Sequence, residues 1–209
     1  MTRLPSQMAD RWQGRAEPGP GQGMLYWHIL LGRSPQVRAL ASMAKDRLAG
    51  FSGLHFTPKQ WLHVTTLTVG FIEEFTETDI GNMVAHVQRL LNDIPPARVT
   101  LGKVLYHPEA IALKVEPAGA LDQVREAVRA AATNGEAKQR ESWIPHITLA
   151  YSTSVQPAEP IIATLGRRLP PYDINVDCVN LVVQEGAERL WNWRSIAEVF
   201  LGSSSKRKM

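Results

Sequence analysis

Hydrophobic and polar positions along the chain alternate between the spacing of strands and the spacing of helices. Runs rich in aromatic and β-branched residues have the length of strands, and apolar residues three and four positions apart indicate amphipathic helices. We expect strands at 24–32, 61–69, 98–105, 111–115, 143–152, 173–183 and 189–199, and helices at 36–48, 77–91, 121–132 and 159–168. The order is roughly βαβαββαβαββ, which predicts helices packed outside one or two sheets.

The two ends of the chain depart from this pattern. Residues 1–22 end in a stretch of glycines and prolines that opposes regular structure, so we expect a flexible N-terminal arm. Residues 203–209 are polar and basic and are expected to form a disordered tail. Residues 23–202 remain as the globular part, which is long enough for one domain or for two half-size lobes that share a core.

Charge changes this picture little. The formal net charge is +3 and the sequence pI is about 9.2, which by itself would suggest a protein that coats nucleic acid. The basic excess lies in the two ends, however, and the globular part is close to neutral. Any contact with RNA must therefore be local.

Cysteine usage and hydropathy bear on the compartment. Cys178 is the only cysteine, so it cannot form an internal disulfide, and burial in a strand is its expected role. The N-terminus has no apolar segment of signal-peptide length, and nowhere do about 18 apolar residues run together. We therefore expect a cytoplasmic protein that neither spans nor binds a membrane.

Two predicted strands carry the same triplet, a histidine followed two positions later by a threonine. The first is His63-Val64-Thr65 and the second is His146-Ile147-Thr148. Because side chains alternate between the faces of a strand, the histidine and threonine of each triplet point the same way. An imidazole and a hydroxyl therefore share a surface twice, which is the observation that points to function.

Such a pair supplies what phosphodiester exchange needs. One imidazole takes a proton from the attacking hydroxyl or water while the other protonates the departing oxygen. The hydroxyls of Thr65 and Thr148 are placed to bind phosphate oxygens. The scheme requires no metal and no cofactor, and the sequence has no clustered cysteines and histidines that would suggest zinc.

Other histidines and aromatic residues could contribute. His55 belongs to a third such triplet, but Pro58 follows it at once, so we interpret that triplet as part of a loop. His28 on the first strand points either into the groove or into the core, and a structural role is the simpler interpretation. The aromatic residues Tyr151, Trp143 and Tyr26 are candidates for stacking on a substrate, with core packing as the alternative.

Over residues 24–200 the chain resembles the two-histidine (2H) phosphoesterase superfamily, which includes bacterial 2′,5′ RNA ligase-like proteins and cyclic phosphodiesterases. The paired motifs and Gly70 carry the resemblance. It implies an α+β fold with two pseudo-symmetric lobes, each an antiparallel sheet with outer helices, around a central groove. It also implies that His63 and His146 are the acid/base pair. Thr66 stands where the family usually has an apolar residue, and we expect it to face away from the groove.

The predicted function is that of a metal-independent phosphoesterase that hydrolyses or reversibly forms 2′,3′-cyclic or 2′,5′-linked phosphodiesters of nucleotides or RNA ends. Two alternatives remain open: a non-catalytic module that binds a nucleotide or RNA end, and a specialised pathway enzyme acting on a nucleotide-derived small molecule. We expect a monomer with no obligate protein partner. The near symmetry of the motifs leaves open which histidine is the general base.

Overall fold

A computed structural model describes residues 4–19, 21–132 and 143–202 of the chain. The predicted disordered tail, 203–209, lies outside the described residues. Within the described part the fold is α+β, with a two-stranded, a four-stranded and a five-stranded antiparallel sheet and four α-helices. This confirms the predicted fold class. No helix of the described part is long and apolar enough to cross a membrane.

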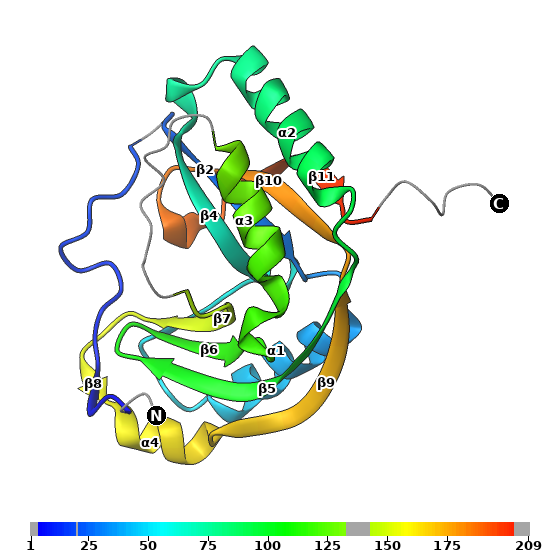
Figure 1. Cartoon of the computed structure of the whole chain (residues 1–209). Coiled ribbons are helices and arrows are strands. Elements are labelled where there is room, and N and C mark those ends of the chain that lie inside the picture. Colours follow the sequence, from blue (N-terminus) through cyan, green and yellow to red (C-terminus); the bar gives the residue numbers. More distant parts are fainter. Residues whose placement is uncertain (1–3, 20, 133–142, 203–209) are drawn as a thin grey trace.

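The four-stranded sheet forms the first lobe. Its strands lie in the order β11 (Trp193–Phe200), β10 (Cys178–Glu185), β2 (Gly23–Leu30) and β4 (His63–Phe71). Two helices, α2 (Glu77–Leu91) and α3 (Asp122–Ala131), pack together beside it, with α2 against β11 and α3 against β4 (Figure 1). The indole of Trp27 on β2 is fully buried and donates to Met83 Sδ on α2, so this face of the sheet belongs to the core.

The five-stranded sheet forms the second lobe. Its strands lie in the order β3 (Leu54–Phe56), β7 (His146–Ser152), β6 (Ala110–Lys114), β5 (Ala97–His107) and β9 (Arg168–Val176). The helix α1 (Pro35–Arg47) packs against β9 and against α4 (Ala158–Leu165). Figure 1 shows β9 as a long strand that curves along one edge of the molecule toward the first lobe.

One predicted strand proves to be two. The continuous apolar pattern at 173–183 is divided at Asp177 between β9 and β10, which belong to different sheets. Cys178 begins β10 and is half-buried and free, and burial together with the nearby charge of Asp177 raises its thiol pKa to about 12. Periodicity could not locate the division, because apolar residues of strand type continue on both sides of Asp177.

Other boundaries follow local chemistry. The helix α2 has the predicted bounds, and a capping box formed by Thr76 and Asp79 fixes its beginning. The predicted helix 159–168 ends earlier, at Leu165, because Gly166 follows with a φ of 81°. The predicted strand 189–199 begins only at Trp193, since the 3₁₀ turn η4 (Glu188–Leu190) precedes it. The remaining 3₁₀ turns are η1 (Lys59–Trp61), η2 (Ile72–Glu74) and η3 (Ala118–Leu121).

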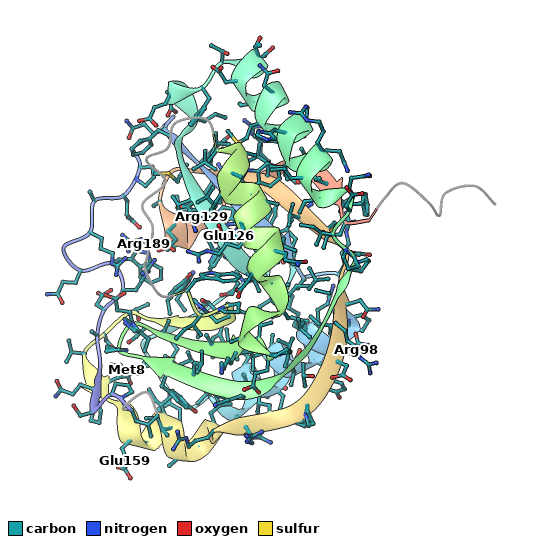
Figure 2. All side chains as sticks on the ribbon, viewed as in Figure 1. Met8, Arg98, Glu126, Arg129, Glu159 and Arg189 are labelled. Carbon is teal, nitrogen blue, oxygen red and sulfur yellow. The ribbon has the colours of Figure 1, made fainter. Side chains whose placement is uncertain are left out.

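The predicted flexible arm is corrected by the structure, because its described residues pack on the domain. Its strand β1 (Gln7–Met8) pairs with β8 (Gln156–Pro157), and the side chain of Met8 is fully buried beside α4 (Figure 2). Arg11 then forms ion pairs with Glu109 and with Glu188, at 3.2 Å and 3.1 Å. The segment thus connects the turn between β5 and β6 to the loop between β10 and β11. Composition pointed to a free arm because these contacts are all long-range.

Candidate active site

The two His-x-Thr motifs begin neighbouring strands of different sheets. His63 is the first residue of β4, and His146 is the first residue of β7. The two strands contact each other where the lobes meet. The charge of His146 lowers the pKa of His63, so the two imidazoles lie within electrostatic range. The tertiary structure therefore brings together the two histidines that the sequence singled out.

Both imidazoles are held in the same way by the backbone. His63 Nδ1 lies 2.6 Å from the carbonyl oxygen of Trp61, and His146 Nδ1 lies 2.7 Å from that of Ile144. A carbonyl can only accept, so each Nδ1 carries the proton and donates it. This leaves Nε2 of each ring as the nitrogen available to take or give a proton.

A bulge follows the threonine of each motif. The pairing of β4 with β2 shifts register past Thr65, so that Thr66 is the extra residue. The pairing of β7 with β6 shifts in the same way past Thr148, with Leu149 as the extra residue. A bulge re-aims the side chains that follow it. The two motifs therefore share a local backbone geometry as well as a sequence.

The threonines differ in their surroundings. Thr66 is buried and donates to the carbonyl of Trp27, so its hydroxyl already has a partner, and its expected direction away from the groove stays a prediction. Thr65 is half-buried, and Thr148 is buried with its hydroxyl next to that of Tyr151.

His63 lies in a buried aromatic environment. Its ring centroid is 4.1 Å from that of His28 and 4.9 Å from that of Trp193. Burial lowers the pKa of His63 to about 4, and the charge of His146 acts in the same direction, whereas the Trp61 carbonyl and Glu188 oppose it. The imidazole is consequently neutral at pH 7. His146 differs in being exposed to solvent.

The three aromatic candidates have different contacts. Tyr26 on β2 stacks on His28 with ring centroids 5.0 Å apart, and burial raises its pKa to about 12. Trp143 donates from Nε1 to the carbonyl of Thr65 at 3.1 Å and lies under the guanidinium of Arg125, so it ties the second motif to the first. The stacking roles of these residues stay predictions.

Tyr151 lies on β7, the strand that begins with His146. The guanidinium of Arg11 lies 5.1 Å from the centre of its ring, and Trp191 stacks on it at 6.2 Å. Burial raises the pKa of Tyr151, and the charge of Glu188 adds to the effect. Burial acts to lower the pKa of Arg11, but Glu188, Tyr151 and Glu109 together outweigh burial, so the pKa of Arg11 is raised.

His55 lies on a strand and not in the predicted loop. It belongs to β3, pairs across the strands with Tyr151, and accepts from Trp191 Nε1 at 2.8 Å. Pro58 follows β3 and does not interrupt it. The ring of His55 is therefore close to the site but already has a partner.

Sequence reasoning missed several residues that contact His63, Tyr151 or His55, or that link to them through Glu188. Arg11 and Trp12 belong to the segment predicted to be free, and Trp191, Trp193 and Glu188 belong to the region of the last predicted hairpin. Trp12 Nε1 and the Arg11 guanidinium both donate to the Glu188 carboxylate. The only available signal in the sequence for these residues was the pair Trp191 and Trp193, separated by one residue. Such a pair indicates core packing as readily as a binding site.

The site shows no arrangement for a bound metal among the described residues. No group of three or more histidine, cysteine, aspartate or glutamate side chains is placed there to hold an ion.

Comparison with known families adds one match. The model of the 2′-5′ RNA ligase superfamily matches residues 34–188, which is well over half of the chain and includes both His-x-Thr motifs. No curated protein matches the chain by sequence.

Solved structures share the fold. TT0787 of Thermus thermophilus is 21% identical over 87% of this chain and 100% of its own, with a TM-score of 0.62. LigT of E. coli in complex with 3′-AMP is 16% identical over 89% of this chain and 99% of its own, with a TM-score of 0.63. LigT is also known in complex with NADP+ and with ATP. The MHV ns2 PDE domain is 11% identical over 88% of this chain and 100% of its own, with a TM-score of 0.53.

Proposed function

The chain belongs to the 2′-5′ RNA ligase superfamily, and from this premise we propose that it is a metal-independent phosphodiesterase in which His63 and His146 are the acid/base pair. Its proposed substrates are 2′,3′-cyclic or 2′,5′-linked phosphodiesters of nucleotides or RNA ends. One observation carries the proposal. Each imidazole donates Nδ1–H to a backbone carbonyl two residues earlier, so that both rings keep Nε2 free where β4 and β7 meet.

The environments of the histidines favour His63 as the general base. Its pKa of about 4 means that it enters the reaction neutral and able to accept a proton. A bound phosphodiester is negatively charged and favours the protonated imidazole, so its arrival increases the proton affinity of His63. His146 is exposed to solvent, and we assign to it the donation of a proton to the leaving oxygen.

A nucleotide is the substrate class that the surroundings support. Trp193 contacts His63, Trp191 contacts Trp193, and Tyr26 stacks on His28; all three aromatic residues are half-buried, so their rings could stack on a base. The superfamily relative LigT forms complexes with 3′-AMP, NADP+ and ATP. The alternative of a non-catalytic binding module would not require two titratable rings with matched free nitrogens.

A substrate screen tests the function directly. The wild-type protein should hydrolyse at least one member of a set containing 2′,3′-cyclic nucleotides, 2′,5′-linked dinucleotides and RNA with a cyclic phosphate end, with the same rate in the presence of EDTA. Product analysis by liquid chromatography provides the measurement. Binding of these compounds without turnover would support the binding module, and loss of turnover in EDTA would contradict the metal-independent mechanism.

The threonines provide a second prediction. Thr65→Val and Thr148→Val keep the shape of the side chain but remove the hydroxyl that we assign to phosphate. We expect each to raise KM about 10-fold, because a hydrogen bond to a charged group contributes roughly 1.5–3 kcal/mol. Steady-state kinetics and competition by inorganic phosphate measure the effect. Thr68→Val, at an exposed position of the same strand, is the control, and equal KM values in all variants would remove the anchor role.

A further inference from the structure

Within the described part of the chain, polar side-chain atoms without hydrogen-bond partners gather around His28, whose ring contacts His63. They are both ring nitrogens of His28, Oδ1 of Asn180 and Nε1 of Trp193. The side chain of His28 is only 1% exposed and that of Asn180 only 4% exposed. Leaving a buried polar group unpaired costs about 1–3 kcal/mol, so unpaired groups in one place call for a functional explanation.

These atoms belong to one location on the sheet. His28 on β2 is directly opposite Asn180 on β10 in the strand register. The ring of Trp193 stacks on His28 at 5.3 Å with an interplanar angle of 23°. The rings of His28 and Trp193 also contact His63, so these two side chains border the imidazole that we assign as the base.

Within 4–19, 21–132 and 143–202, no residue is a hydrogen-bond partner of the His28 ring. The carbonyl of Trp27 acts to raise the pKa of His28 but does not meet hydrogen-bonding geometry with its ring. That carbonyl already accepts from Thr66. Burial, together with the neighbouring His63, lowers the pKa of His28 well below its usual value. His28 is therefore a neutral imidazole with one donor and one acceptor.

The three side chains supply neutral donors and acceptors and no charge. Asn180 presents an acceptor, Trp193 a donor, and His28 one of each. A phosphate would call for a cationic group, which these three side chains do not supply. A water molecule matches them in kind, because it can accept from one N–H and donate to Oδ1 of Asn180 while keeping one hydrogen and one lone pair for reaction.

We propose that His28, Asn180 and Trp193 form a subsite that holds the attacking water next to Nε2 of His63. The proposal rests on the proposed function and makes hydrolysis, not transfer to an alcohol, the preferred reaction. One hydrogen of the water goes to His63, and the second is held by an acceptor of the subsite. An alcohol has no second hydrogen and places a carbon group against that acceptor.

Hydrolysis of a 2′,3′-cyclic phosphate then moves one proton at each histidine. The water oxygen forms a bond to phosphorus as its proton passes to Nε2 of His63. The bond from phosphorus to one ribose oxygen breaks, and that oxygen keeps the electron pair and takes a proton from Nε2 of His146. The product is a phosphate monoester, and exchange with solvent returns both histidines to their starting forms.

Competition between water and methanol tests the subsite. A 2′,3′-cyclic nucleotide is turned over in buffer containing methanol, and the ratio of methyl ester to monoester is measured. His28→Phe and Asn180→Leu keep shape and remove the polar atoms. We expect kcat for hydrolysis to fall at least 10-fold with little change in KM, and the methyl ester fraction to rise severalfold. His86→Phe, on α2, is the matched control and should behave as wild type.

Stability separates this role from a structural one. Removing unpaired buried atoms should leave the thermal midpoint of each variant unchanged or raise it. An unchanged product ratio in both variants, with an active wild type and an inactive His63→Ala, would overturn the subsite and leave the proposed function intact. A wild type without turnover on any substrate would overturn both. If one variant does not fold, the other still decides the outcome.

Discussion

Replacing His63 or His146 by alanine should lower kcat for a 2′,3′-cyclic nucleotide roughly 10²- to 10⁴-fold, the usual contribution of a general acid or base. Each variant keeps the other imidazole and both threonines, so substrate binding should change less than turnover. Steady-state kinetics of the two single variants and of the double variant measure the effect. Because the two rings act on one proton-transfer sequence, we expect the double variant to be only slightly slower than either single one.

The controls for this prediction use the same chemistry elsewhere in the chain. His86→Ala removes a half-buried histidine from α2 and should leave kcat unchanged.

The acidic limb of the wild-type kcat/KM profile should lie near pH 4, where the neutral form of His63 is lost. Two single variants that each turn over substrate at the wild-type rate would contradict the assignment of both histidines.

The free energy of unfolding should decrease as the pH falls from about 6.5 to about 4. The pKa of His63 is about 4 in the folded protein, whereas an unfolded chain gives a histidine a pKa of about 6.5. Between these values the unfolded chain binds more protons, so the free energy of unfolding rises with pH across this window and is constant above it. At about 1.4 kcal/mol for each tenfold difference in proton affinity, His63 accounts for about 3 kcal/mol.

His63→Gln isolates this contribution. Glutamine does not titrate, so the variant should lose about 3 kcal/mol less than wild type between pH 7 and pH 4 in urea unfolding. The neighbours His28 on β2, His146 on β7 and Glu188 in the β10–β11 loop remain in both proteins, and the lowered pKa of His28 adds stability loss of the same sign to each. Identical pH profiles for wild type and variant would show that His63 is not held neutral by burial.

Local pattern was sufficient for much of the fold. The helix α2 has its predicted bounds, because apolar spacing and a capping box act within a few residues of one another. The two His-x-Thr triplets were recognised for the same reason, since alternation along one strand decides that the histidine and threonine share a face. The order of these elements predicted helices outside one or two sheets, and the family resemblance carried by the triplets implied the α+β class.

Contacts between segments distant in sequence decided the parts of the fold that the local pattern did not predict. The division of the pattern at Asp177 into two sheets, and the packing of Met8 and Arg11 on the domain, depend on partners distant in sequence. The same holds for the position of His28. From the sequence, the side chain of His28 could point either into the groove or into the core. Only the pairing of β2 between β4 and β10 brings the ring of His28 to His63 and places His28 opposite Asn180.

The sequence by itself therefore determined which residue types could carry the chemistry, because a triplet on one strand is a local property. The tertiary structure alone decided how their protons are held. The burial that makes His63 neutral comes from side chains on other strands and loops, and no periodicity along the chain specifies which of these side chains meet.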